Sequence, residues 1–120
     1  MRTLITGGLG CVGVNYAIHS LRRGDEVIVY DNHARGASNY LNERLLVRVA
    51  AQLKKKLYLV PGDVANDLEF EHVFDFGPID RVLHAAAQSS VNVSIYDPGL
   101  DFVSNVIGTF QLLEEFRKRS

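Results

Sequence analysis

A glycine-rich segment near the start of the chain carries the clearest chemical signal. Residues 6–13 read Thr-Gly-Gly-Leu-Gly-Cys-Val-Gly. Gly7 permits a sharp turn, Gly10 lets backbone amides approach a bound group, and Gly13 lets a following helix lie close to a sheet. Unpaired N–H groups and the dipole at the start of that helix attract an anion. The spacing predicts a dinucleotide pyrophosphate site formed by Gly7, Gly10, Cys11, Val12 and Gly13.

A carboxylate further along the chain fits the same ligand. Asp31 follows Gly13 by eighteen residues and ends a run of β-branched residues. An aspartate there accepts hydrogen bonds from the ribose hydroxyls of adenosine and repels a 2′-phosphate, which favours NAD over NADP. Arg35, a few residues on, can offset that repulsion. Two structural alternatives stay open: glycines that serve only a tight turn, and an Asx turn at Asp31.

These residues need a scaffold, and the pattern predicts alternating strands and helices. Short apolar runs predict strands over residues 3–6, 26–30, 57–60 and 81–84. A helix from Val12 should bury Val14, Ala17, Ile18 and Leu21. A second helix, after a loop over residues 32–39, should bury Leu41, Leu45, Val49 and Leu53. A short third helix should bury Phe70, Val73 and Phe74.

The end of the chain predicts one more helix. After a polar loop with Ser89, Ser90 and Ser94, Asp97 caps this helix and Pro98 opens it. The apolar stripe expected to face inward is Val103, Val106, Ile107, Phe110 and Leu113. Strands that alternate with helices predict an α/β fold: a parallel sheet of about four strands with helices on both faces. This is one half of a doubly wound, Rossmann-type fold.

Composition narrows the class of protein. The chain has 120 residues, 47% of them hydrophobic, and a net charge of −1. Without a basic excess we expect no nucleic-acid partner, and no apolar run approaches the ~20 residues that span a bilayer. A single cysteine excludes an internal disulfide, and the scattered histidines argue against a metal site. The start of the chain lacks a signal-peptide pattern, so we expect a cytoplasmic protein.

Several motifs together resemble one family. Thr-Gly-Gly-x-Gly-x-x-Gly over residues 6–13 resembles the extended short-chain dehydrogenase/reductases, the NAD-dependent sugar-nucleotide epimerases and dehydratases. Residues 31–36 resemble their ribose-contacting loop, residues 62–64 the stretch whose acid faces adenine, and residues 84–87 a small-residue loop beside the cofactor. Residues 94–98 and 105–109 resemble the entry to the helix after the fourth strand. The further NAD contacts that this resemblance implies are Asn32, Arg35, Asp63, Val64, Ala85, Ala86, Ala87 and Asn105.

The resemblance runs from Thr3 to about Phe116, with two departures. Cys11 stands where the family usually has an aromatic residue. The family's catalytic Tyr-x-x-x-Lys pair is absent, since none of the five tyrosines has a lysine four residues on. We therefore assign no catalytic residue. We expect residues 1–120 to form an incomplete NAD-binding domain, truncated before the catalytic and substrate-binding region.

The function implied is the NAD-binding portion of a nucleotide-sugar epimerase or dehydratase, without turnover by itself. Residues 87–88, 101–102 and 108–109 resemble the CDP-paratose and CDP-tyvelose 2-epimerases within the family. A nucleotide sugar is a partner only if another chain completes the site. The alternative is a non-catalytic NAD-binding sensor or one subunit of a split enzyme. An uncovered edge of the fourth strand predicts a homo-oligomer.

Two polar residues have structural expectations of their own. His84 ends a buried strand and is expected to be a hydrogen-bonded core residue rather than a catalyst. Asn105 lies within a predicted helix, where asparagine is unfavourable. It is therefore expected to make a specific hydrogen bond to a neighbouring strand or loop.

Overall fold

A four-stranded parallel sheet forms the centre of the molecule. The computed structural model describes residues 1–119, and Ser120 lies outside the described residues. The sheet order is β3-β2-β1-β4. The strands are β1 (Arg2–Thr6), β2 (Glu26–Asp31), β3 (Leu57–Pro61) and β4 (Arg81–His84). Leu4 of β1 lies opposite Ile28 on one side and Val82 on the other, so β1 is central. All four predicted strands and the α/β fold class are confirmed.

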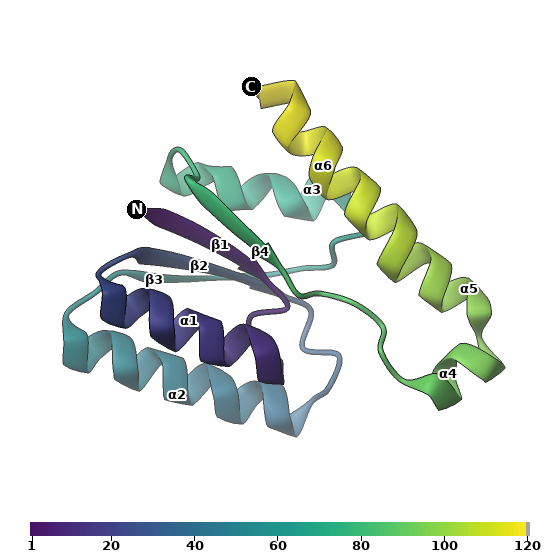
Figure 1. Ribbon diagram of the computed structural model, residues 1–120, viewed down its shortest axis with the longest axis horizontal. Coiled ribbons are helices and arrows are strands. Elements are labelled where there is room, and N and C mark those ends of the chain that lie inside the picture. Colours follow the sequence, from purple (N-terminus) through teal and green to yellow (C-terminus); the bar gives the residue numbers. More distant parts are fainter. Residues whose placement is uncertain (120) are drawn as a thin grey trace.

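Helices cover both faces of this sheet (Figure 1). Helices α1 (Cys11–Arg23) and α2 (Ala37–Leu53) lie on one face. The predicted stripe of α1 is confirmed, because Val14, Ala17 and Leu21 are buried and Ile18 packs partly against them. Helix α3 (Asp67–Phe70), the 3-10 helix η1 (Glu71–Phe76) and helix α6 (Gly108–Arg119) lie on the other face. Phe70 and Val73 are buried there, as predicted.

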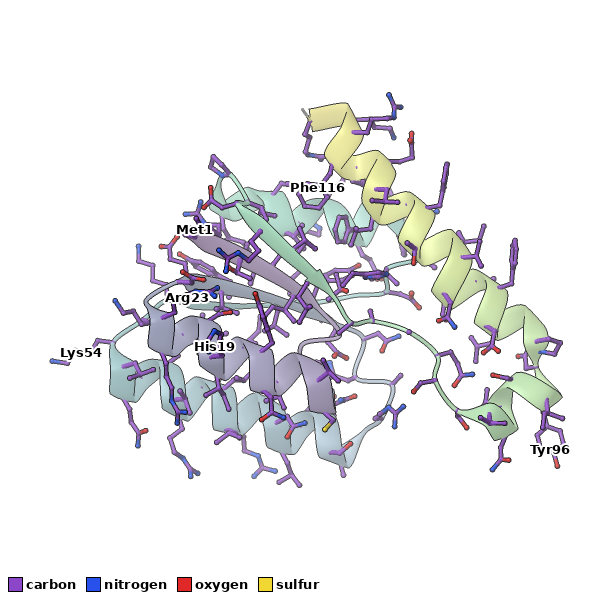
Figure 2. All side chains as sticks on the ribbon, in the orientation of Figure 1. Met1, His19, Arg23, Lys54, Tyr96 and Phe116 are labelled. Carbon is purple, nitrogen blue, oxygen red and sulfur yellow. The ribbon has the colours of Figure 1, made fainter. Side chains whose placement is uncertain are left out.

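The segment after β4 leaves the sheet before it returns as a long helix. The predicted polar loop contains a short helix, α4 (Val91–Tyr96), whose Tyr96 is 89% exposed at the far end of the molecule (Figure 2). Helix α5 (Pro98–Asp101), the π-helical segment η2 (Phe102–Ile107) and α6 follow without a break. The Asp97 side chain caps this helix by accepting the Leu100 N–H at 3.1 Å, as predicted. No helix within residues 1–119 has both the length and the apolar character to cross a membrane.

The buried face of α2 differs from the prediction. Leu41, Leu45 and Leu53 are 60%, 39% and 38% exposed, and Val49 alone of that stripe packs partly against the core. The helix begins at Ala37, inside the predicted loop, and its buried residues are Asn39, Leu46 and Ala50. A hydrogen bond from Asn39 Nδ2 to the Leu9 carbonyl of the glycine-rich turn holds this face of the helix inward, so a polar residue takes an inward position.

The predicted stripe of the last helix is also wrong. Val103, Val106, Phe110 and Leu113 are between 44% and 61% exposed, and Ile107 alone of that stripe is half-buried. The buried residues of α6 are Gly108, Leu112 and Glu115. At helical spacing, residues 108, 112 and 115 share one face, opposite the face that carries residues 103, 106, 110 and 113. The apolar stripe of this helix therefore faces away from the sheet.

Candidate functional site

The glycine-rich turn joins β1 to α1 at the carboxyl edge of the sheet. Gly7 has a φ of +66°, and its N–H donates to the Tyr30 carbonyl at 2.8 Å. A Cβ at Gly7 would lie 2.7 Å from the Ala86 nitrogen. A Cβ at Gly13 would overlap the carbonyl oxygen of Gly7. Glycine is therefore required at both positions by the close approach of backbone to backbone.

Gly10 serves a different purpose in the same turn. It is the N-cap of α1, and a Cβ there would meet nothing nearer than the Gly7 oxygen at 3.4 Å. The first turn of α1 has no side-chain cap and no acidic residue. Its N–H groups and the positive end of the helix dipole can thus meet an anion, and the open space at Gly10 lets that anion approach. This local geometry fits a pyrophosphate.

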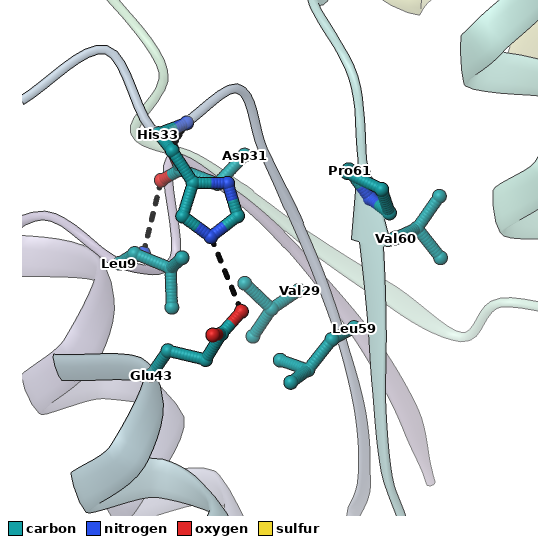
Figure 3. A pocket seen from close by; sticks show the side chains of 8 residues that line it. All are labelled: Leu9, Val29, Asp31, His33, Glu43, Leu59, Val60 and Pro61. Carbon is teal, nitrogen blue, oxygen red and sulfur yellow. Dashed lines mark hydrogen bonds and ion pairs between the residues drawn. The ribbon is translucent and has the colours of Figure 1, made fainter. Parts of the chain in front are cut away.

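The Asp31 carboxylate is tied to this turn (Figure 3). Its Oδ2 accepts the Leu9 N–H at 3.1 Å, and its Oδ1 accepts the His33 N–H at 2.8 Å. The second bond is the Asx turn considered as an alternative role. Because a carboxylate accepts about four hydrogen bonds, both oxygens keep acceptor capacity for ribose hydroxyls. The turn-forming role of Asp31 is thus compatible with a ligand-binding one.

Two residues that sequence reasoning missed hold the turn from α2. Asn39 Nδ2 and Asn42 Nδ2 donate to the Leu9 carbonyl at 2.9 and 2.7 Å. Asparagines at helical spacing i and i+3 were the available signal, because they present two amides on one helix face. The Leu9 N–H is hydrogen-bonded to Asp31 and the Leu9 carbonyl to these two amides. Both backbone polar groups of Leu9 are therefore held in place.

A cleft of about 1000 Å³ opens at this edge of the sheet. Every predicted contact residue lines it except Asn105: Gly7, Gly10, Cys11, Val12, Gly13, Asp31, Asn32, Arg35, Asp63, Val64, Ala85, Ala86 and Ala87. Arg35 Nη2 donates to Ser89 Oγ at 2.7 Å, which joins the loop after β2 to the loop after β4. Sequence motifs far apart in the chain therefore surround one cleft.

A smaller cavity of about 120 Å³ adjoins the cleft through Leu9 and Asp31, which line both (Figure 3). Its walls are mainly apolar and come from the ends of β2 and β3. His33 Nε2 lies 3.1 Å from Glu43 Oε1, and the His33 ring stacks on Tyr40 with centroids 4.6 Å apart. His33 has a φ of +57°, which turns the chain away from β2 and into this position.

The segment after β3 forms a further wall. Asp63 Oδ1 accepts the Ala65 N–H at 2.9 Å, and the Asp63 carbonyl accepts the Tyr30 hydroxyl at 2.8 Å. Burial, with smaller contributions from Glu69 and Asp63, raises the pKa of Tyr30, so this hydroxyl keeps the proton that it donates. The Asp63 N–H donates to Glu69 Oε2 at 2.8 Å. The position of Asp63 in the cleft is therefore set by several contacts.

The loop after β4 forms the opposite wall, and Asn105 acts on it rather than on the cleft. Asn105 Oδ1 accepts the Gln88 N–H at 2.8 Å, and Asn105 Nδ2 donates to the Gln88 carbonyl at 3.0 Å. The expected hydrogen bond from Asn105 to a neighbouring loop is confirmed. Gln88, which the sequence did not single out as a site residue, also binds through its side chain to Ser94 Oγ at 3.1 Å.

His84 is a half-buried, hydrogen-bonded residue, as expected. Its ring nitrogens lie 2.6 Å from Thr6 Oγ1 and 3.1 Å from Thr109 Oγ1. Burial lowers the pKa of His84, which favours the neutral ring. His84 therefore ends β4 as a structural residue just before the loop that lines the cleft.

Comparison with curated proteins finds nucleotide-sugar epimerases. The chain is 32% identical to the UDP-glucose 4-epimerase of Halalkalibacterium halodurans over 115 residues, which are 96% of this chain and 30% of that enzyme. It is 34% identical to the CDP-paratose 2-epimerase of Salmonella typhi over 119 residues, 98% of this chain and 33% of that enzyme. The chain thus spans about a third of the length of these relatives.

Solved structures agree with this similarity. The UDP-glucose 4-epimerase of Bifidobacterium longum in complex with NAD⁺ and UDP superposes with a TM-score of 0.83 at 31% identity, over 98% of this chain and 34% of that one. The Thermus thermophilus UDP-glucose 4-epimerase complex with NAD gives a TM-score of 0.78 at 35% identity, over 98% and 34%. The family described as GDP-mannose 4,6 dehydratase matches residues 4–120. Since this match covers nearly the whole chain, the chain belongs to the GDP-mannose 4,6 dehydratase family.

Proposed function

We propose that the chain is the NAD-binding portion of a nucleotide-sugar epimerase or dehydratase. The observation that carries this proposal is the cleft that joins the uncapped start of α1 to the Asp31 carboxylate. An anion site and a hydroxyl acceptor at one edge of a parallel sheet suit the two halves of an adenosine diphosphate. Structures with which the chain superposes were determined with NAD, which supports the same ligand here.

Each wall of the cleft has a role in this proposal. The pyrophosphate lies on the N–H groups at Gly10–Gly13, and the adenosine ribose bonds to Asp31. Asp63 and Val64 lie on the adenine side, and Ala85–Ala87 pack beside the nicotinamide half. Arg35 Nη2 donates to Ser89 Oγ, and within residues 1–119 no ion pair joins Arg35 to Asp31, so the Asp31 carboxylate still disfavours a 2′-phosphate and supports NAD rather than NADP. Bound NAD would supply the hydride acceptor of the reaction.

The substrate and the activity belong to a larger unit in this proposal. Because the chain lacks a Tyr-x-x-x-Lys pair, it supplies cofactor contacts but not the base that removes a hydroxyl proton. We expect no epimerase turnover from the 120-residue chain, and nucleotide-sugar binding only with the remaining region or a second chain. A sensor or a split-enzyme subunit uses the same cleft. Recovery of turnover on mixing with a chain that carries the missing pair would identify a split enzyme. A cytoplasmic location stays a prediction.

Self-association is part of the proposal as well. Within residues 1–119, β4 pairs only with β1 and is an edge strand. The outward stripe of η2 and α6 exposes Val103, Val106, Phe110 and Leu113 by 44–61%. An open strand edge beside an apolar helix face favours pairing with a second copy of the chain.

Calorimetric titration of the 120-residue chain with NAD and NADP tests the cofactor proposal. We expect one NAD per chain and much weaker binding of NADP. Asp31→Asn should weaken NAD binding by about 10- to 100-fold, because a hydrogen bond to a charged group is lost. Asp75→Asn is the control, since Asp75 is 65% exposed on η1 and pairs with His72. Equal binding by the wild type and Asp31→Asn would contradict the assigned role of Asp31, and a folded wild type that binds no NAD would overturn the function.

A further inference from the structure

A chain of hydrogen bonds crosses the carboxyl edge of the sheet through His84. The Ala86 N–H donates to Thr6 Oγ1 at 3.3 Å, and Thr6 Oγ1 lies 2.6 Å from His84 Nδ1. On the other side of the ring, His84 Nε2 lies 3.1 Å from Thr109 Oγ1. Thr109 Oγ1 in turn donates to the Asn105 carbonyl at 2.6 Å. These hydrogen bonds thus connect β1, β4 and the long helix.

For a neutral His84 ring, the direction of every one of these hydrogen bonds follows from the groups at its two ends. The Asn105 carbonyl can only accept a hydrogen bond, so the Thr109 hydroxyl donates its one proton to this carbonyl. Thr109 must therefore accept from His84, which puts the ring proton on Nε2 and leaves Nδ1 as an acceptor. The Thr6 hydroxyl donates to Nδ1 and still accepts the Ala86 N–H. A neutral ring satisfies all these groups, and burial favours the same state.

Both ends of this series of hydrogen bonds contact the loop after β4. Thr6 holds the N–H of Ala86, one of the residues that line the cleft. Asn105, whose carbonyl accepts from Thr109, holds Gln88 through both its N–H and its carbonyl. The loop is therefore attached at Ala86 and again at Gln88, two residues on. His84 links these two attachments.

We propose that His84 is a positioning residue, which fixes residues 85–88 against the cofactor through Thr6 on one side and through Thr109 and Asn105 on the other. The inference rests on the proposed function, because the loop is taken to pack beside NAD. It assigns the two ring nitrogens separate tasks. The Nε2 arm, which runs through Thr109 and Asn105, leads to two hydrogen bonds on Gln88. The Nδ1 arm, which runs through Thr6, leads to one longer hydrogen bond on Ala86. The Nε2 arm therefore holds the loop more firmly.

Substitutions that keep one arm at a time test this assignment. The amide of glutamine can reach the place of Nε2, and the shorter asparagine the place of Nδ1. His84→Gln should therefore keep most of the affinity for NAD, whereas His84→Asn should weaken it about tenfold, the effect of one lost hydrogen bond. Thr109→Val should weaken NAD binding by a similar factor. Thr109→Ser, the matched control, keeps the hydroxyl and should restore near wild-type affinity.

The combination of variants separates positioning from general destabilisation. Thr109→Val added to His84→Asn should weaken NAD binding little further, because both remove the same arm. Nitrogen NMR of the ligand-free chain should show a neutral His84 ring with its proton on Nε2, and faster exchange of the Gln88 amide in Thr109→Val than in Thr109→Ser. The Thr109 pair keeps the test decisive if a His84 variant does not fold.

The outcomes distinguish the two proposals. A wild-type chain that binds no NAD overturns the proposed function and the role of the loop in binding. If the wild type binds NAD and Thr109→Val binds it equally well, the cofactor site stands and the positioning role of His84 is overturned. A ring proton on Nδ1, or an unchanged exchange rate of the Gln88 amide in Thr109→Val, also overturns it.

Discussion

Asp31 shows how one carboxylate can carry a structural and a ligand-binding role together. Its two oxygens accept backbone N–H groups of Leu9 and His33, which closes the turn after β2 and fixes the glycine-rich turn. A pre-positioned acceptor loses little conformational freedom when a ligand binds. The position of Asp31 was predictable from its spacing to Gly13. Its bond to Leu9 was not, because that contact depends on how the two loops fold against each other.

The pH dependence of stability provides a test at His84. Its pKa in the folded chain is lowered from the ordinary value of 6.5 by burial, so the unfolded chain binds a proton at higher pH than the folded chain does. The stability that depends on neutral His84 is thus complete above pH 6.5 and is lost as the pH falls toward the lower folded-state pKa. Urea unfolding at about pH 7.5 and about pH 5 should show a larger loss for the wild type than for His84→Gln. Parallel pH profiles would contradict a depressed pKa.

At the scale of elements, two glycines of the glycine-rich turn have different roles: Gly13 is needed for the fold, and Gly10 for the binding of a ligand. A Cβ at Gly10 meets nothing nearer than 3.4 Å, whereas a Cβ at Gly13 would lie 2.7 Å from the Gly8 Cα and overlap Gly7. Gly10→Ala should keep the unfolding temperature near that of the wild type but reduce NAD affinity at least about tenfold, since the added methyl group faces the approaching ligand. Gly13→Ala should lower stability by about 1–3 kcal/mol, the typical cost of overpacking.

Thermal unfolding measures the stability of the Gly10→Ala and Gly13→Ala variants, and NAD titration measures their affinity for the cofactor. Gly99→Ala is the control, because Gly99 lies in helix α5, away from the glycine-rich turn, and its Cβ would also approach no atom nearer than 3.4 Å. A Gly10→Ala chain that binds NAD as tightly as the wild type would exclude a pyrophosphate at this turn.

The elements differ in how far the sequence predicted them. All four strands were predictable, because short apolar runs alternate with helical patterns and three of these runs are followed by Gly7, Asp31 and Pro61. The buried faces of α2 and the last helix were not. Hydrophobic periodicity treats each apolar side chain as inward, yet Asn39 is buried by its bond to Leu9, and on α6 Glu115 is buried while Phe110 is exposed. Helix α4, with six residues, is too short for periodicity to detect.

The whole molecule presents an apolar surface that predicts association. Phe110 is 60% exposed on α6, in the stripe that faces away from the sheet. Phe110→Glu should shift the chain toward monomer without loss of fold, because a charge would be buried in the contact between copies. Leu41→Glu on α2 is matched in exposure at 60% and should leave the association unchanged. Sedimentation velocity over a range of concentrations measures both, and a wild type that stays monomeric throughout would refute the homo-oligomer.

The central place of β1 in the sheet also governs how the chain folds during synthesis. β1 acquires its partner β2 early, but its other edge pairs with β4, where Thr6 meets a residue 78 positions later. Contacts so distant along the chain form late and slow the folding of parallel sheets. While the ribosome makes α2, β3 and α3, β1 therefore keeps one edge open. The sheet, and with it the cleft above its carboxyl edge, is completed only when β4 docks.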